Sequence, residues 1–126
     1  MFDLKKYIIK HFTKIKVVHS IPGRIRLKLS NMTKLPKECK FYDNYLKGAI
    51  TMIEGIEEVN FNYIIGTIII KYNINKVYEI KILKWLDKIV EIGIDNFEFI
   101  QTYGEKNLDY VIKTLEQDLK DAINII

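Results

Sequence analysis

The sequence is poor in cysteine, histidine and proline, and it has no long hydrophobic run. The single cysteine, Cys39, excludes an internal disulfide and suits a reducing compartment. The longest nearly continuous apolar stretch, Ile64 to Ile70, is far shorter than the roughly 20 residues that a membrane-spanning helix needs. We therefore expect no transmembrane segment or secretory signal, and a cytoplasmic protein that is at most peripheral to a membrane.

Residue groupings typical of enzymes and metal sites are also missing. His11 and His19 are the only histidines, and no Asp, Glu or Cys is spaced to complete a metal-binding set with either. No phosphate-binding loop or dinucleotide fingerprint occurs. Nothing marks a third residue that would orient a pair of Cys39 and a histidine for nucleophilic catalysis. We expect no catalytic residues, no metal ligands and no cofactor, and we expect the protein not to be an enzyme.

Positive charge is concentrated in the first third of this 126-residue chain, whose 48% hydrophobic content predicts one folded domain. Residues 1–40 contain 11 Lys and Arg against two acidic residues, a net of +9. Residues 41–126 contain 9 against 14, a net of −5, so the chain carries +4. This asymmetry indicates an anionic partner, which could be membrane headgroups, nucleic acid, phosphate or an acidic protein surface. The alternative is that the basic segment lies on the acidic body of the same molecule.

Residues 1–16 are predicted to form a cationic amphipathic helix. Leu4, Ile8, Phe12 and Ile15 recur at helical spacing. Such a helix either lies on an anionic membrane surface or packs its apolar stripe on the domain. In the first case the membrane-surface residues are Lys5, Lys6, Lys10 and Lys14.

Residues 17–29 are predicted to form one strand, with a bulge or bend at Pro22-Gly23 because proline lacks the ladder donor. From Arg24 onward polar and apolar residues alternate strictly, which is the period of a half-buried strand. One face would carry Ile25, Leu27 and Leu29, and the other Arg24, Arg26 and Lys28.

The rest of the chain predicts alternating helices and strands. We expect a helix over 37–54, strands over 59–63 and 67–72, a helix over 76–92 with Trp85 near the edge of its apolar face, and a strand over 95–103. Residues 104–126 predict a C-terminal amphipathic helix that packs on this domain, a second copy or a partner. The order is that of an α+β, ferredoxin-like βαββαβ domain over 17–103 with a four-stranded antiparallel sheet. Right-handed crossovers would place the basic strand mid-sheet, opposite the helices.

Two segments resemble a known family. His19-Ser20-Ile21-Pro22-Gly23-Arg24-Ile25-Arg26 and the later Val59-x-x-Asn62-x-x-x-Gly66 pattern are similar to the heavy-metal-associated domain in a divergent form that lacks the CxxC motif. The resemblance spans roughly residues 17–103. It implies a relation to metal-transporting P-type ATPases and to small stand-alone proteins, some linked to bacterial iron-storage compartments.

The resemblance fails at the family's metal loop. In the usual members, a methionine-x-cysteine-x-x-cysteine loop supplies two thiolates to a soft metal. Aligning Met32-Thr33 with that loop puts Lys34 and Lys37 at the cysteine positions, and Cys39 lies beyond them. Two ammonium groups repel a cation, so we do not expect the usual soft-metal chaperoning.

Specific nucleic-acid binding is also not expected. RNA recognition motifs share this strand order and stack bases on aromatic residues of the two central strands. The matching outward positions here are Arg24, Arg26, Lys28, Thr67, Ile69 and Lys71, and none is aromatic.

The favoured hypothesis is a non-enzymatic accessory protein of metal homeostasis, with iron as a candidate metal. It would dock on a metal-transporting P-type ATPase or its compartment membrane. The partner-binding or anion-binding residues would be His19, Arg24, Arg26 and Lys28. The alternative is an interaction or scaffold module with no metal role, which forms a homo-oligomer through its C-terminal helix.

Overall fold

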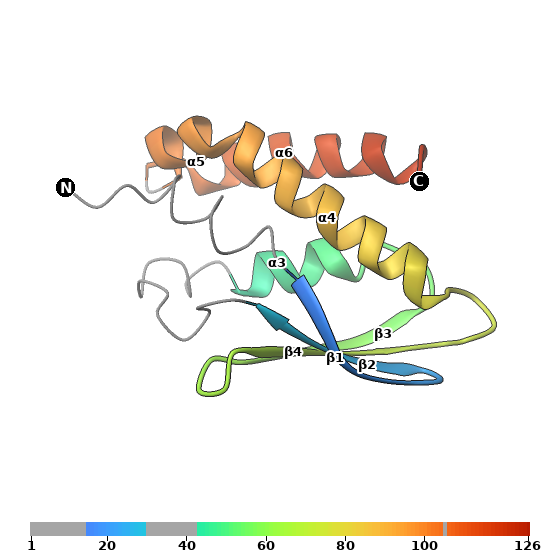
Figure 1. The fold of residues 1–126 in the computed structure, drawn as a ribbon. Helices are drawn as coiled ribbons and strands as arrows, with labels where there is room; N and C mark the ends of the chain where they lie inside the picture. Colours follow the sequence, from blue (N-terminus) through green and yellow to red (C-terminus); the bar gives the residue numbers. More distant parts are fainter. Residues whose placement is uncertain (1–14, 30–42, 105) are drawn as a thin grey trace.

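The computed structural model describes residues 15–29, 43–104 and 106–126 (Figure 1). The predictions for residues 1–14, including Lys5, Lys6, Lys10 and Lys14, lie outside the described residues. The same holds for the loop that contains Lys34, Lys37 and Cys39.

The described chain forms one four-stranded antiparallel sheet in the order β1-β2-β4-β3. Its strands are β1 (Ile15–Ile21), β2 (Arg24–Leu29), β3 (Ile56–Asn62) and β4 (Thr67–Tyr72). The helices are α3 (Asp43–Ile50), α4 (Glu79–Asp95), α5 (Phe97–Tyr103) and α6 (Leu108–Ile123). All four lie on the same side of the sheet (Figure 1). The α+β class is confirmed, and the architecture is consistent with a ferredoxin-like fold.

The stretch 17–29 is a hairpin, so the prediction of one continuous strand is wrong. Ile21 pairs with Arg24, and Pro22-Gly23 forms the two-residue connection. Gly23 has a φ of 83°, and proline followed by a glycine of positive φ is the combination that a type II turn uses. The predicted bend is thus a complete reversal. Lys16, predicted to end the N-terminal helix, lies in β1.

Residues 97–103 form α5, so the strand predicted over 95–103 is also wrong. Phe97 and Phe99 alternate as in a strand, but Phe99 and Tyr103 also fit helical spacing, and their ring centroids lie 5.3 Å apart. Phe97 is buried. The sheet position beside β2, which a final strand would occupy in the predicted βαββαβ order, is filled by β1. The described elements up to α4 therefore follow one another as ββαββα, and two further helices, α5 and α6, extend the chain.

The core lies between the sheet and the helices. Ile25, Leu27 and Ile70 from the sheet and Ile82 and Trp85 from α4 are fully buried in it. The Trp85 indole Nε1–H donates to the backbone oxygen of Ala49 in α3 at 3.0 Å. Trp85 is therefore central rather than near the edge, because the buried face of α4 follows 82, 85 and 86.

The C-terminal helix packs on this domain. Its residues Val111 and Ala122 are buried, and Ala122 belongs to the same core cluster as the sheet residues. Leu119 and Ile123 pack against that cluster. The apolar stripe that the sequence predicts on this helix thus has a partner within the chain.

Candidate functional site

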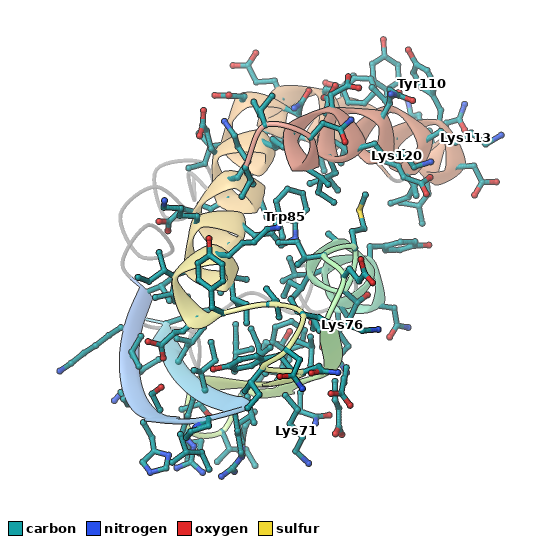
Figure 2. The ribbon with its side chains drawn as sticks, turned by 90° about the vertical axis from the view of Figure 1, so that its right-hand side faces the viewer. Lys71, Lys76, Trp85, Tyr110, Lys113 and Lys120 are labelled. Carbon is teal, nitrogen blue, oxygen red and sulfur yellow. The ribbon has the colours of Figure 1, made fainter. Side chains whose placement is uncertain are left out.

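The side of the sheet opposite the helices is called the open face, because none of the described helices covers it (Figure 1). Residues that pair across antiparallel strands share a face, so the registers identify its members. They are Lys16, His19 and Ile21 of β1, Arg24, Arg26 and Lys28 of β2, Thr67, Ile69 and Lys71 of β4, and Glu58, Asn60 and Asn62 of β3. Figure 2 shows Lys71 pointing away from the helices, whereas Trp85 points into the molecule.

A register shift in β1 places His19 on this face. Val17 pairs with Leu27, and regular pairing would then put Val18 opposite Arg26. The shift between Val17 and His19 instead pairs His19 with Arg26. Because a one-residue slip moves a side chain to the other face, the irregularity turns the histidine outward.

Basic side chains face each other across the strands of the open face. Lys16 pairs with Lys28, and Arg24 pairs with Lys71. Like charges directly opposite one another destabilise a sheet. The arrangement therefore costs stability wherever no anionic group neutralises one of the paired cations.

Only one of these cations is neutralised by a described residue. The Lys71 ammonium lies 3.3 Å from the Glu58 carboxylate, and the Asn60 amide donates to the same carboxylate at 2.8 Å. The Asn60 hydrogen bond, followed by the Lys71 contacts, lowers the pKa of Glu58 below its ordinary value of 4.5. Among the described residues, Lys16, Arg24, Arg26 and Lys28 form no salt bridge. Among the described residues, none of the salt bridges therefore joins the basic segment (residues 1–40) to the acidic body, because Lys71 and Glu58 both belong to that body.

Two polar atoms on the open face are buried without a hydrogen-bond partner. They are the Nε of Arg26 and the Oγ1 of Thr67. Thr67 as a whole is only 6% exposed. The two residues are diagonal neighbours, since Arg26 pairs with Ile69 and Lys28 with Thr67. An unpartnered buried donor costs roughly 1–3 kcal/mol, which adds to the cost of the like-charge pairs.

All four residues that the sequence predicts for partner binding, His19, Arg24, Arg26 and Lys28, lie together on the open face. Sequence reasoning missed Lys16, which belongs to β1, and it did not include Lys71. The strict alternation around Lys71 already placed it outward. No signal identified Lys16, because its position depends on the hairpin register.

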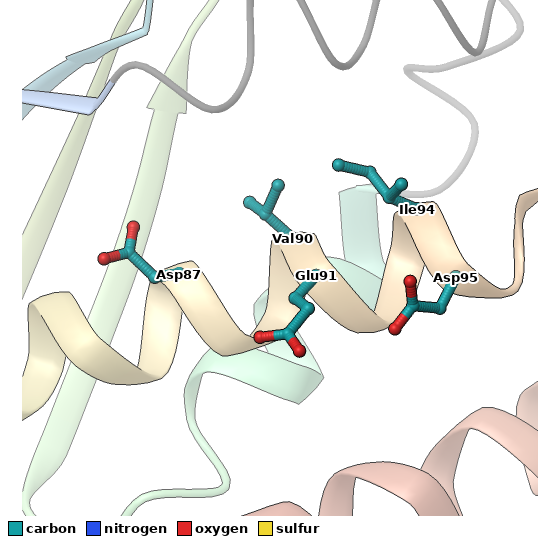
Figure 3. Close-up of a pocket in the computed structure, with 5 residues that line it drawn as sticks. All are labelled: Asp87, Val90, Glu91, Ile94 and Asp95. Carbon is teal, nitrogen blue, oxygen red and sulfur yellow. The ribbon is translucent and has the colours of Figure 1, made fainter.

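The described residues contain no group of three His, Cys, Asp or Glu that could hold a metal ion. A shallow hollow on α4 is lined by Asp87, Val90, Glu91, Ile94 and Asp95 (Figure 3). Its three acidic residues follow one helix at intervals of four, so Asp87 and Asp95 are separated by roughly 12 Å along the axis. They cannot converge on one ion. Glu91 is also 3.4 Å from the Lys88 ammonium.

None of the helices over the described residues is both long enough and apolar enough to span a bilayer.

Residues 4–124 match the family model described as heavy metal associated domain 2. The match is wider than the 17–103 range of the resemblance, and it takes in all of β1 and all of α6. No curated protein and no solved structure gave a significant match.

Proposed function

The chain belongs to the heavy metal associated domain 2 family, and we propose that it is a non-enzymatic accessory protein of metal homeostasis. Membership indicates a metal-related role. The proposal adds that the protein acts from the cytoplasm and docks through its open face on a metal-transporting P-type ATPase or on the membrane of the compartment that this ATPase serves. Iron is the candidate metal, from the resemblance to proteins linked to iron-storage compartments.

The observation that carries the proposal is the set of open-face cations without acidic partners among the described residues: Lys16, Arg24, Arg26 and Lys28. Lys16 lies opposite Lys28, which is unfavourable within the isolated protein, whereas Lys71, opposite Arg24, is neutralised by Glu58. An acidic partner surface would relieve this repulsion and would steer association. Removal of the repulsion would then contribute favourably to the free energy of binding. His19, Arg24, Arg26 and Lys28 are the proposed docking residues.

The chemistry of the open face favours contact with a partner over direct metal binding. Ammonium and guanidinium groups attract anions and repel metal cations. The metal-related role is therefore proposed to operate through the docked ATPase. The self-associating scaffold is less well supported, because Val111 and Ala122 of α6 are already buried within this chain.

Capture of a partner tests the proposal. The tagged full-length protein is incubated with detergent-solubilised native membranes, and bound proteins are identified by mass spectrometry. We expect a metal-transporting P-type ATPase, whose transported metal then identifies the metal involved. The triple variant Arg24→Glu, Arg26→Glu, Lys28→Glu should reduce capture by about tenfold or more, because the reversed charges would repel an acidic partner surface.

The matched control reverses three exposed lysines elsewhere, Lys84→Glu, Lys106→Glu and Lys113→Glu, and gives the same change in net charge. It should leave capture nearly unchanged. Equal loss in both triple variants, or no ATPase among the proteins bound by wild type, would contradict the proposal.

A further inference from the structure

The turn between β3 and β4 presents two adjacent isoleucines to solvent. Ile64 is 89% exposed and Ile65 is 53% exposed. Isoleucine is among the residues most often buried, and single exposed apolar residues are common, but an adjacent pair at a loop tip is not the usual surface pattern. In Figure 1 this loop projects beyond the end of the sheet.

Hydrogen bonds within the turn hold the isoleucines in this outward position. The Asn62 side-chain oxygen accepts from the backbone N–H groups of Ile64 at 3.0 Å and Ile65 at 3.3 Å. The Gly66 N–H donates to the Asn62 carbonyl at 2.8 Å, and Gly66 has a φ of 72°. The hydroxyl of Tyr63 donates to the carboxylate of Asp43 at the start of α3. The tip is therefore pre-organised rather than collapsed onto the domain.

Unneutralised cations lie at the same end of the sheet. Asn62 and Thr67 close the turn, Thr67 pairs with Lys28, and Lys28 pairs with Lys16. The Leu29 N–H also donates to the Gly66 carbonyl at 3.2 Å, which ties the end of β2 to the turn. Neither Lys16 nor Lys28 forms a salt bridge with a described residue.

The opposite end of the sheet also has exposed apolar residues, but of its open-face cations, Arg24 and Lys71, only Arg24 lacks an acidic partner among the described residues. Ile74 is 58% exposed and Ile80 is 59% exposed. Lys71 is paired with Glu58 at 3.3 Å, and Lys76 lies 3.8 Å from Glu54. Over the part of the chain that the structure describes, only the β3–β4 end combines a projecting apolar tip with two opposed lysines that both lack a salt bridge.

We propose that the Ile64–Ile65 tip inserts into the interfacial region of an anionic membrane while Lys16 and Lys28 contact the lipid headgroups. In a bilayer leaflet the anionic headgroups lie at the surface and the hydrocarbon lies beneath them. A projecting apolar tip with lysines set behind it matches these two layers. An acidic protein surface would satisfy the lysines but would offer no apolar phase for the isoleucines. The inference rests on the proposed function and specifies its membrane contact.

Vesicle binding tests the two parts of this contact separately. Co-sedimentation uses phosphatidylcholine vesicles with and without about 30% phosphatidylserine. Wild type should bind the anionic vesicles and release as salt rises. The double variant Ile64→Ser, Ile65→Ser should bind at least about tenfold more weakly, because two apolar side chains lose their burial. The control Ile74→Ser, Ile80→Ser alters two other isoleucines that are each more than half exposed, at the other end of the molecule, and it should bind within about twofold of wild type.

The charge variant Lys16→Gln, Lys28→Gln should weaken binding by roughly tenfold or more, since each basic residue at the headgroups contributes separately. Its unfolding midpoint should be at least that of wild type, because it removes a like-charge pair, so weaker binding cannot be attributed to unfolding. The control Lys71→Gln, Lys76→Gln should have a smaller effect on binding.

Insertion itself is measured with Ile64→Trp. The native Trp85 is fully buried and provides a constant background. On addition of vesicles with brominated acyl chains, the introduced indole should shift to shorter emission wavelength and be quenched, whereas Trp85 in wild type should not. Absence of quenching, or of vesicle binding by wild type, would overturn the inference.

The same variants separate this inference from the proposed function. If Ile64→Ser, Ile65→Ser loses vesicle binding but still captures the ATPase from detergent, the tip contacts lipid as inferred. If it loses the ATPase in detergent and keeps vesicle binding, the tip contacts protein and the inference is wrong. Vesicle binding without capture of any ATPase would contradict ATPase docking alone.

Discussion

The two faces of the sheet are built from the same strands and have opposite properties. On the covered face, Ile25, Leu27 and Ile70 are fully buried against the helices. On the open face, their immediate neighbours Arg24, Lys28 and Lys71 are basic. The covered face stabilises the protein by burying apolar side chains. The open face destabilises it, because like charges lie opposite one another there. The alternation of side chains along a strand allows both within six residues.

The largest expected effect compares neighbours in β4 that point to opposite faces. Ile70→Ala should lower the free energy of unfolding by about 2–5 kcal/mol, because it leaves a cavity in the core. Ile69→Ala, on the open face, should cost only about 1 kcal/mol, since its side chain is partly exposed. Chemical denaturation measures both. Equal losses would show that the open face is covered in solution.

An intermediate effect concerns the turn that joins the two basic strands. Gly23 has a φ of 83°, and an added Cβ would lie 3.2 Å from the Tyr72 carbonyl oxygen. Gly23→Ala should therefore destabilise the protein by about 1–2 kcal/mol.

The control for the turn is Gly48→Ala in α3, where a Cβ meets nothing within 4 Å. It should stabilise the protein by up to about 1 kcal/mol, because alanine is the better helix former. A neutral result for Gly23→Ala in denaturation would show that the hairpin turn adapts to the side chain.

The smallest effect concerns the one neutralised pair on the open face. The pKa of Glu58 is lowered in the folded protein by the Asn60 hydrogen bond and by Lys71. Its contribution to stability is therefore present above the ordinary value of 4.5 and is lost as the pH falls through the lowered pKa.

A carboxyl NMR titration should find the pKa of Glu58 below 4.5 in wild type and closer to 4.5 in Asn60→Ala. An unchanged pKa in that variant would assign the shift to Lys71 instead. Because the Glu58 side chain is half exposed to solvent, the midpoint of thermal unfolding should respond only weakly to the same variant.

Much of the sheet was predictable because its strands alternate strictly. The strands over 59–63 and 67–72 and the split of β2 into apolar and basic faces agree with the structure to within a few residues. The helix predicted over 76–92 is present as α4 (Glu79–Asp95), although its buried face is centred on Trp85. These elements contain enough periodic residues for one period to dominate.

Two predictions failed where the local pattern suited more than one structure. Residues 97–103 carry aromatic residues at both strand and helix spacing, and a segment this short cannot distinguish them. The sheet edge beside β2 was then filled by β1, which needs only the Pro22-Gly23 connection. Closing so short a loop costs less entropy than bringing in a strand from the far end of the chain.

By itself the sequence determined the α+β composition, the alternation that separates core from cations in β2 and β4, and the membership of the family. Only the tertiary structure decided that β1 folds back on β2, that the shift at Val18 turns His19 outward, and that Lys16 lies opposite Lys28. It also decided that the unpaired lysines lie beside the exposed tip of Ile64 and Ile65. The reason is physical: periodicity fixes which way a residue points within its own strand, whereas register between strands fixes which residues meet.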